Sequence, residues 1–217
     1  MKSIVLSRRL LLTCFCLVWV AFGLLQAVLG QNNMVLAINA HWSPFLDHTI
    51  PPLTFLGDGV FCVVLGLLAL IGSYRLGISI LISYIVSGLL VQFLKRVVYA
   101  DAYRPPVVLA QKLPYLHHTP GIEWLHHGSF PSGHTTSAFA VFMCLALFSK
   151  YKTIQFICLL LAIIVAFSRM YLLAHFPADV WIGAMIGLGF ALGSTFACKY
   201  WFQRLPARAL DSGAWNV

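Results

Sequence analysis

The chain of 217 residues is 60% hydrophobic and only 9% charged, and its mean hydropathy is +0.88. Soluble globular domains carry about 25% charged residues, so this composition excludes an ordinary soluble domain and predicts an integral protein of the membrane bilayer. The net charge of +8 is compatible with nucleic-acid binding. However, the basic residues lie at the ends of apolar runs, as membrane topology requires, so we expect no nucleic-acid partner.

Six apolar stretches follow one another along the chain. They cover about residues 10–29, 53–72, 76–98, 130–148, 153–173 and 178–200. A helix needs about 20 apolar residues to cross a bilayer, and no linker or repeat divides the stretches. The sequence therefore predicts an all-α fold, a six-helix transmembrane bundle that forms a single domain over residues 1–217. It leaves the oligomeric state open.

The first stretch allows two interpretations. Lys2, Arg8 and Arg9 precede it, and Val28 and Gly30 follow a passable signal-peptidase pattern, so the stretch could be a cleaved signal peptide. The apolar run is longer than the apolar core of a typical signal peptide, which favours a retained first helix.

Two segments between the stretches differ in character. Residues 31–52 contain no lysine or arginine but three prolines, and we expect a loop there. Residues 99–128 form the longest polar segment and contain four histidines, at positions 117, 118, 126 and 127. Their paired spacing matches no standard zinc arrangement, so we expect solvated loop histidines or contacts with a lipid headgroup, and no metal. The six cysteines form no CxxC pair, which indicates buried free thiols.

Small and acidic residues inside the stretches have simple structural explanations. Asp58 is a carboxylate near the outer end of the second stretch. Such a position makes it a functional candidate, but we favour a structural hydrogen bond. Glycines at positions 183, 187, 189 and 193 indicate close packing of the last helix against a neighbour.

The basic residues predict the orientation in the membrane. If both ends of the chain are inside, the inner side holds Lys2, Arg8, Arg9, Arg75, Lys150, Lys152, Lys199, Arg204 and Arg208. The outer side then holds Lys95, Arg96, Arg104, Lys112 and Arg169. The excess lies inside, as the positive-inside rule requires. Cations kept on the unfavoured side indicate a function other than topology.

Two motifs fall at this outer border. Ser129–Ser137 reads SFPSGHTTS at the start of the fourth stretch, where Ser132 and the following backbone N–H groups can hold phosphate oxygens beside His134. Ser168–Asp179 reads SRMYLLAHFPAD. His175 and Asp179 are four residues apart and can face the same way on a helix. The carboxylate can then hold one ring nitrogen and leave the other free.

Cations, a hydroxyl, two histidines and one acid at a single membrane border fit phosphoryl transfer. Guanidinium and ammonium groups stabilise the negative charge on the phosphoryl oxygens. One histidine can attack phosphorus to form a phosphohistidine, and the second can protonate the leaving oxygen. This arrangement needs no metal and the outer face offers no carboxylate cluster for magnesium, so we expect no cofactor.

The two motifs resemble the second and third signatures of the type 2 phosphatidic acid phosphatase family, which are PSGH and SR, five residues, H, three residues, D. The match is complete at Pro131, Ser132, Gly133, His134, Ser168, Arg169, His175 and Asp179. The six-span layout is similar too. The resemblance implies that His175 is the nucleophile, Asp179 its orienting partner and His134 the acid for the leaving group. It also implies a phosphoryl-binding set of Arg104, Arg169, Ser132 and Gly133.

The first signature of that family departs here in its spacing. The family usually has a lysine, six residues and then Arg-Pro, whereas eight residues separate Lys95 from Arg104-Pro105 and seven separate Arg96. Both cations are candidates for a phosphate contact. We favour Lys95 because the first signature of the family has a lysine, which carries an ammonium group, at this position.

The sequence thus predicts a membrane lipid phosphatase with its site on the outer face, which in a bacterium is the periplasmic side of the inner membrane. Its substrate would be a lipid phosphomonoester or diphosphate, such as undecaprenyl diphosphate, phosphatidylglycerophosphate, phosphatidic acid or lipid A. One alternative is a lipid phosphotransferase that uses the same phosphohistidine. Another is a non-catalytic protein that binds or transports lipid phosphates, although binding alone would not require the His175–Asp179 pair.

Overall fold

The structure is a computed structural model that describes residues 8–202, and every regular element in this range is helical. The long helices are α2 (Arg9–Leu29), α5 (Gly59–Gly72), α6 (Tyr74–Phe93), α8 (Gly133–Phe148), α9 (Lys152–Tyr171) and α10 (Pro177–Phe202). The shorter ones are α3 (Gln31–Ala40), α4 (Pro44–Thr54), η1 (Phe55–Gly57), the π-helical η2 (Leu94–Val98), α7 (Pro105–Val108) and η3 (Ala110–Tyr115). Lys2, Arg204 and Arg208, which we expected on the inner side, lie outside the described residues.

The expected all-α membrane fold is confirmed, and within residues 8–202 four helices are long and apolar enough to cross a bilayer. They are Arg9–Leu29, Tyr74–Val98, Lys152–Tyr171 and Pro177–Tyr200. A fifth span results if Pro44–Gly57 and Gly59–Gly72 count as one path bent by 55°. The bend falls at Asp58, whose carboxylate accepts a hydrogen bond of 2.8 Å from Val60 N at the start of α5. The structural hydrogen bond expected for Asp58 is therefore confirmed.

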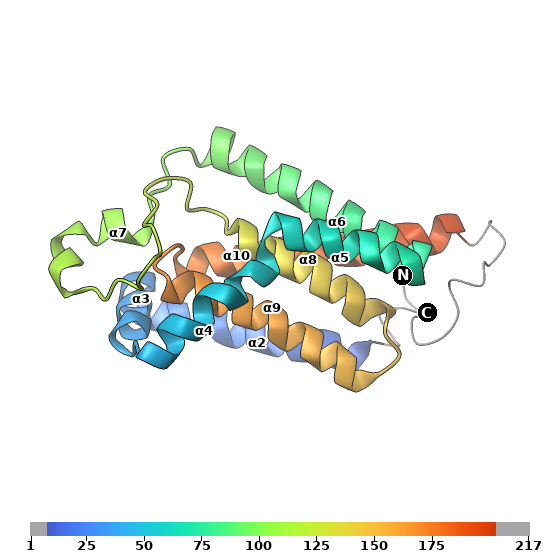
Figure 1. The fold of residues 1–217 in the computed structure, drawn as a ribbon, viewed down its shortest axis with the longest axis horizontal. Coiled ribbons are helices and arrows are strands. Elements are labelled where there is room, and N and C mark those ends of the chain that lie inside the picture. Colours follow the sequence, from blue (N-terminus) through green and yellow to red (C-terminus); the bar gives the residue numbers. More distant parts are fainter. Residues whose placement is uncertain (1–7, 203–217) are drawn as a thin grey trace.

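Helix α8 lies at the centre of the bundle, between α6, α9 and α10 (Figure 1). Its 16 residues correspond to about 24 Å, which is shorter than the hydrocarbon core of about 30 Å. Twelve of the 16 residues are buried. Neighbouring helices, rather than lipid, therefore surround most of α8.

Two glycines of α10 allow it to approach α8 closely, as the sequence indicated. A Cβ atom at Gly183 would lie 2.9 Å from Ser132 O, and one at Gly187 would lie 2.5 Å from Thr136 O. Gly189 and Gly193 have no such neighbour within 4 Å. Close packing thus explains the first pair and not the second.

We expect Gly187→Ala to destabilise the protein by about 1–3 kcal/mol, because the added methyl group collides with the backbone of α8. The matched control is Gly189→Ala, where the methyl group meets open space and raises helix propensity by up to about 1 kcal/mol. Thermal unfolding in detergent measures both variants. Equal melting temperatures for the two would contradict the close packing.

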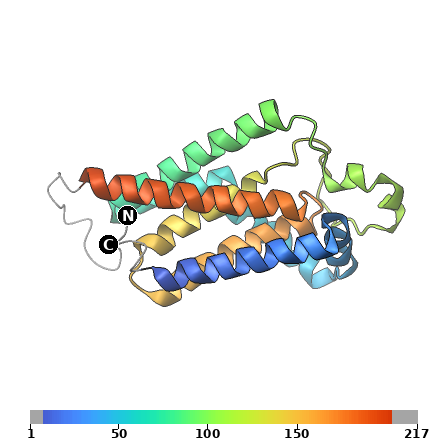
Figure 2. The same cartoon turned by 180° about the vertical axis from the view of Figure 1, so that it is seen from behind.

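The described ends of the bundle lie together, at the opposite end from the long polar segment. Figures 1 and 2 show the start of α2 and the end of α10 at one end of the molecule. The segment that carries α7 and η3 projects from the other end. The turn between α9 and α10 and the start of α8 face this second end, and the two predicted motifs lie there.

The prediction of a loop over residues 31–52 is wrong, because this region folds into α3 and α4. Ser43 caps α4 by accepting a bond from Leu46 N, and Pro44 occupies the first turn, where its missing N–H costs nothing. Pro51 and Pro52 lie inside α4 near its end, just before the bend. Met34, Val35 and Asn39 of α3 are buried, so tertiary packing overrides the weak helix propensity of this polar sequence.

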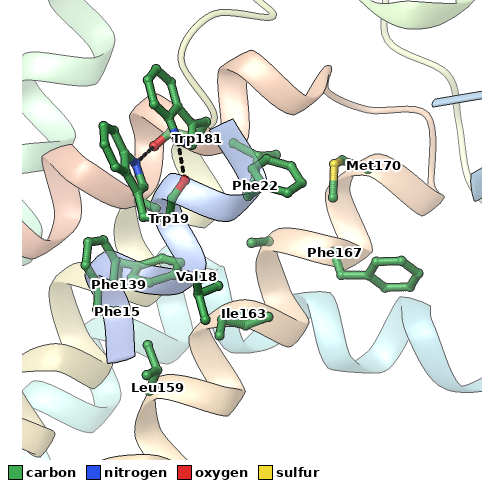
Figure 3. Close-up of a pocket in the computed structure, with 13 residues that line it drawn as sticks. Phe15, Val18, Trp19, Phe22, Phe139, Leu159, Ile163, Phe167, Met170 and Trp181 are labelled. Atoms are coloured by element: carbon green, nitrogen blue, oxygen red, sulfur yellow. Dashed lines mark hydrogen bonds between the residues drawn. The ribbon is translucent and has the colours of Figure 1, made fainter. Parts of the chain in front are cut away.

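Helix α2 packs against α10 through two indoles. Trp19 Nε1 donates to Trp181 O at 3.0 Å and Trp181 Nε1 donates to Trp19 O at 2.9 Å, with the rings stacked 4.1 Å apart (Figure 3). Beside this pair lies an apolar pocket of about 220 Å³ between α2, α9 and α10.

All six cysteines are free, and four are buried as expected, whereas Cys14 is partly buried and Cys16 is exposed.

Candidate active site

A tight turn between α9 and α10 presents His175. At the end of α9, Ala174 N donates to Arg169 O at 3.0 Å and Leu173 N donates to Met170 O at 3.1 Å. This is a Schellman motif, and Leu173 occupies its left-handed position with φ of 54°. That conformation costs a leucine about 1–2 kcal/mol. Burial of Leu173 in a cluster with Val35, Leu109 and Phe176 offsets the strain.

The carboxylate of Asp179 is held by several donors at the start of α10. Its Oδ2 accepts 2.9 Å from Phe176 N, three residues earlier, which is the reciprocal half of a capping box. The same oxygen lies 3.3 Å from His175 Nδ1 and also accepts from the Ser129 hydroxyl. His175 and Asp179 are both buried, with 2% and 4% of their surfaces exposed. With Nδ1 turned to the carboxylate, the second nitrogen of the ring, Nε2, is left for chemistry.

The first turn of α8 docks directly on this pair. Ser132 N donates to Asp179 O at 3.0 Å, and the fully buried Ser132 hydroxyl caps α8 by accepting from Thr135. Gly133 and His134 are the first two residues of the helix. A Cβ atom at Gly57 would lie 2.6 Å from His134 O, so the bend between α4 and α5 packs on the same turn.

Lys95 and Arg104 meet at the end of the long polar segment. Lys95 Nζ donates to Gly128 O at 2.7 Å, and Arg104 Nη2 lies 3.4 Å from the same oxygen. Arg104 also donates to His127 O and to Ala174 O, each at 2.9 Å. Burial lowers the pKa of the Arg104 guanidinium, and Asp179 opposes this effect. The other candidate cation, Arg96, is exposed to solvent or lipid.

Arg169 keeps part of its guanidinium available. Its Nη1 donates to Thr54 Oγ1 at 2.8 Å, which joins the last turn of α9 to α4. Its Nε is buried and has no hydrogen-bond partner among residues 8–202. A buried donor without a partner is costly, and an anionic ligand would satisfy it.

The electrostatic surroundings keep His175 neutral. Burial, and then the positive charges of Arg104 and Arg169, hold the pKa of His175 well below its usual value. Lys95 and His134 act in the same direction. The three cations are thus close enough to the ring to act on it, and together with burial they disfavour its protonated form.

A polar network secures the long segment above the site. Asp47 of α4 accepts 2.6 Å from the Tyr171 hydroxyl and 3.3 Å from Thr119, and its other oxygen lies 2.7 Å from His117 Nε2. Asn39 and the backbone of His117 exchange two bonds of 2.9 Å. His117 is therefore a packed structural residue, and not the solvated one expected.

Within the described part of the chain no three His, Cys, Asp or Glu residues are grouped to hold a metal.

A cavity of about 380 Å³ opens beside His134. The first turn of α8 forms one wall, with Gly133, His134 and Ser137, while the other residues come from the α5 and α6 region. Most of the latter are apolar or glycine, including Gly57, Gly59, Ile85, Gly88, Leu89 and Val91. The cavity thus places the His134 side chain beside mostly apolar walls.

The structure brings together the residues that the two sequence motifs singled out. Gly133 and His134 follow Ser132, which contacts Asp179, and Lys95 and Arg104 share Gly128 O. Two contacts were missed. The first is the contact of Ser129 with Asp179, and the only sign of it in the sequence was that Ser129 lies inside the first motif. Thr54 carries no signal, because its partner Arg169 lies 115 residues away.

Comparison with known proteins identifies a family and two solved structures with a similar fold. A family model described as the PAP2 superfamily matches residues 76–205, more than half of the chain. The crystal structure of Aquifex aeolicus LpxE is 27% identical, with a TM-score of 0.66 over 74% of this chain and 92% of that chain. A transmembrane PAP2 type phosphatidylglycerolphosphate phosphatase from Bacillus subtilis shares the fold, at 23% identity and a TM-score of 0.61 over 86% of this chain and 94% of that chain. Curated proteins give no significant match. The chain belongs to the PAP2 superfamily and is an integral membrane lipid phosphatase of that group.

Proposed function

We propose that the protein hydrolyses a lipid phosphomonoester or diphosphate through a phosphohistidine on His175, without a metal. The observation that carries the proposal is the buried His175–Asp179 pair, surrounded by Lys95, Arg104 and Arg169. Three cations suit the charge of a phosphoryl group, and an oriented neutral imidazole suits attack on it.

The reaction has two balanced steps. His175 Nε2 attacks phosphorus, a P–N bond forms, the bond to the lipid oxygen breaks, and His134 gives that oxygen a proton. His134 then takes a proton from a water molecule as the water oxygen attacks the phosphohistidine. The P–N bond breaks, phosphate leaves, and both His175 and His134 return to their starting forms. Asp179 orients the ring throughout, while Arg169, Arg104, Lys95 and the N–H groups after Ser132 bind the phosphoryl oxygens.

We further propose six spans, with α8 as the short central one, and a site on the outer face. The common end of α2 and α10 supports an even number of spans (Figure 1). The distribution of lysine and arginine supports an inner position for that end. In a bacterium the site would then face the periplasm.

The substrate chain would enter through the cavity beside His134. That cavity places a proposed catalytic residue beside mostly apolar walls from the α5 and α6 region, which suits a phosphate on an apolar tail. The pocket of Figure 3 has an entirely apolar lining and includes none of the proposed site residues, so we assign it no substrate role. The relative from Bacillus subtilis makes phosphatidylglycerophosphate the first substrate to test.

The direct test is phosphate release by the purified protein from phosphatidylglycerophosphate, phosphatidic acid, undecaprenyl diphosphate and lipid A, with EDTA throughout. We expect release from at least one lipid. Transfer of phosphate to another lipid without inorganic phosphate would identify a phosphotransferase instead. Binding without either product would identify a non-catalytic lipid-phosphate protein.

Lys95→Ala is expected to raise the KM and lower kcat/KM about 10- to 100-fold, because the ammonium group lies beside Arg104 and is partly buried. Arg96→Ala is the matched control and should leave both constants within about twofold, because Arg96 is exposed. Steady-state kinetics on the preferred lipid measures both. The reverse ranking would assign the contact to Arg96.

A further inference from the structure

Ser129 makes a contact with the reaction machinery that the proposed steps above do not use. It directly follows the long polar segment and opens the first motif, and its side chain is buried, with 2% of the residue exposed. Its backbone N donates to Ala102 O at 3.0 Å, near the beginning of the same segment. The backbone of Ser129 is therefore held in place independently of its hydroxyl group.

The Ser129 hydroxyl crosses to Asp179, 50 residues away, and donates to Oδ2. This oxygen is also the one that accepts from Phe176 N and lies near His175 Nδ1. The Ser129 bond is the shortest of the three and the His175 contact, at 3.3 Å, is the longest. Ser129 and the backbone of Phe176 therefore fix the direction of the carboxylate, and the ring aligns with it.

We propose that Ser129 is a positioning residue that orients Asp179 and, through it, the nucleophilic ring of His175. This inference rests on the proposed function of that pair. The torsion that turns a carboxylate is broad, so a second fixed donor is needed to select one direction. Without the Ser129 hydroxyl, the His175 ring has its Nε2 directed at phosphorus in a smaller fraction of the molecules. The cations that bind the phosphoryl group are unchanged.

Ser129→Ala should consequently lower kcat about 10- to 100-fold and leave the KM within about twofold. Ser129→Thr retains the hydroxyl and should retain most of kcat. The matched control is Ser83→Ala, which removes another buried hydroxyl on α6, away from the pair. That hydroxyl donates to Ala140 O and also contacts Cys144. The kcat of this variant should be within about twofold of the wild-type value.

A double-mutant cycle separates positioning from general packing. If Ser129 acts through Asp179, then Ser129→Ala added to Asp179→Ala should lower kcat by less than about twofold further. Independent, multiplying losses would overturn the proposal, as would an unchanged kcat for Ser129→Ala or an equal loss in Ser83→Ala. Wild-type phosphate release, measured alongside, tests the proposed function itself. An active wild type with an unaffected Ser129→Ala variant therefore rejects only the positioning role.

Discussion

Replacing His175 with alanine should reduce phosphate release by at least about 10³-fold, the largest effect that we expect from any single substitution. The reason is that in the proposed mechanism the imidazole forms the covalent bond to phosphorus, and no other histidine contacts Asp179 in the described part of the chain. The remaining cations can still bind the lipid headgroup. Binding of the lipid phosphate should therefore survive while turnover is lost.

The measurement combines phosphate release with a rapid acid-free quench that retains phosphohistidine, using lipid labelled in its phosphate. Wild-type protein should carry label on His175, and His175→Ala should carry none. His48→Ala, at an exposed position in α4, controls for the loss of a histidine and should behave as wild type. Normal turnover by a folded His175→Ala protein would eliminate His175 as the nucleophile.

Asp179→Asn should lower kcat about 10²- to 10³-fold with a small change in KM. The amide has nearly the shape of the carboxylate but no negative charge. It therefore stabilises the developing charge on the His175 ring less well and can favour the wrong tautomer. The Ser129 and Phe176 donors also lose the charged acceptor that they share.

Full kinetics on the preferred lipid, together with thermal unfolding, distinguish this effect from disruption of α10. The isosteric amide should leave the melting temperature within a few degrees of the wild-type value, since it can still accept from Phe176 N. A change in KM alone, with kcat retained, would make Asp179 a headgroup contact. Loss of folded protein would make it chiefly a helix cap.

The parts of this molecule that local spacing determines could be predicted from the sequence. Apolar runs located the long helices, because a membrane span must satisfy its backbone internally and therefore reads as an uninterrupted helix. A separation of one helical turn predicted that His175 and Asp179 would adjoin, and the structure brings them within 3.3 Å. The glycines at positions 183 and 187 predicted a close helix contact.

The parts that depend on distant partners could not be predicted. Residues 31–52 are polar and rich in proline, and only packing on the bundle makes them helical. The contacts of Ser129 with Asp179 and of Thr54 with Arg169 join positions 50 and 115 residues apart. Serine and threonine occur at most kinds of position, so the presence of Ser129 or Thr54 in the sequence does not indicate a distant hydrogen-bond partner. His117 was misjudged for the same reason, because its partner Asp47 is 70 residues away.

The π-helical turn Leu94–Val98 has a consequence for how the family motif tolerates variation in length. Tyr99 N bonds to Leu94 O, five residues back, so this turn accommodates more residues than an α-helical one. The chain has two residues more between Lys95 and Arg104 than the family pattern, yet both side chains reach Gly128 O. Extra residues here alter the winding of the backbone and leave both cations at the site. The contact at Gly128 thus depends on where the two charged groups arrive in space, and the count of residues between Lys95 and Arg104 does not by itself determine it.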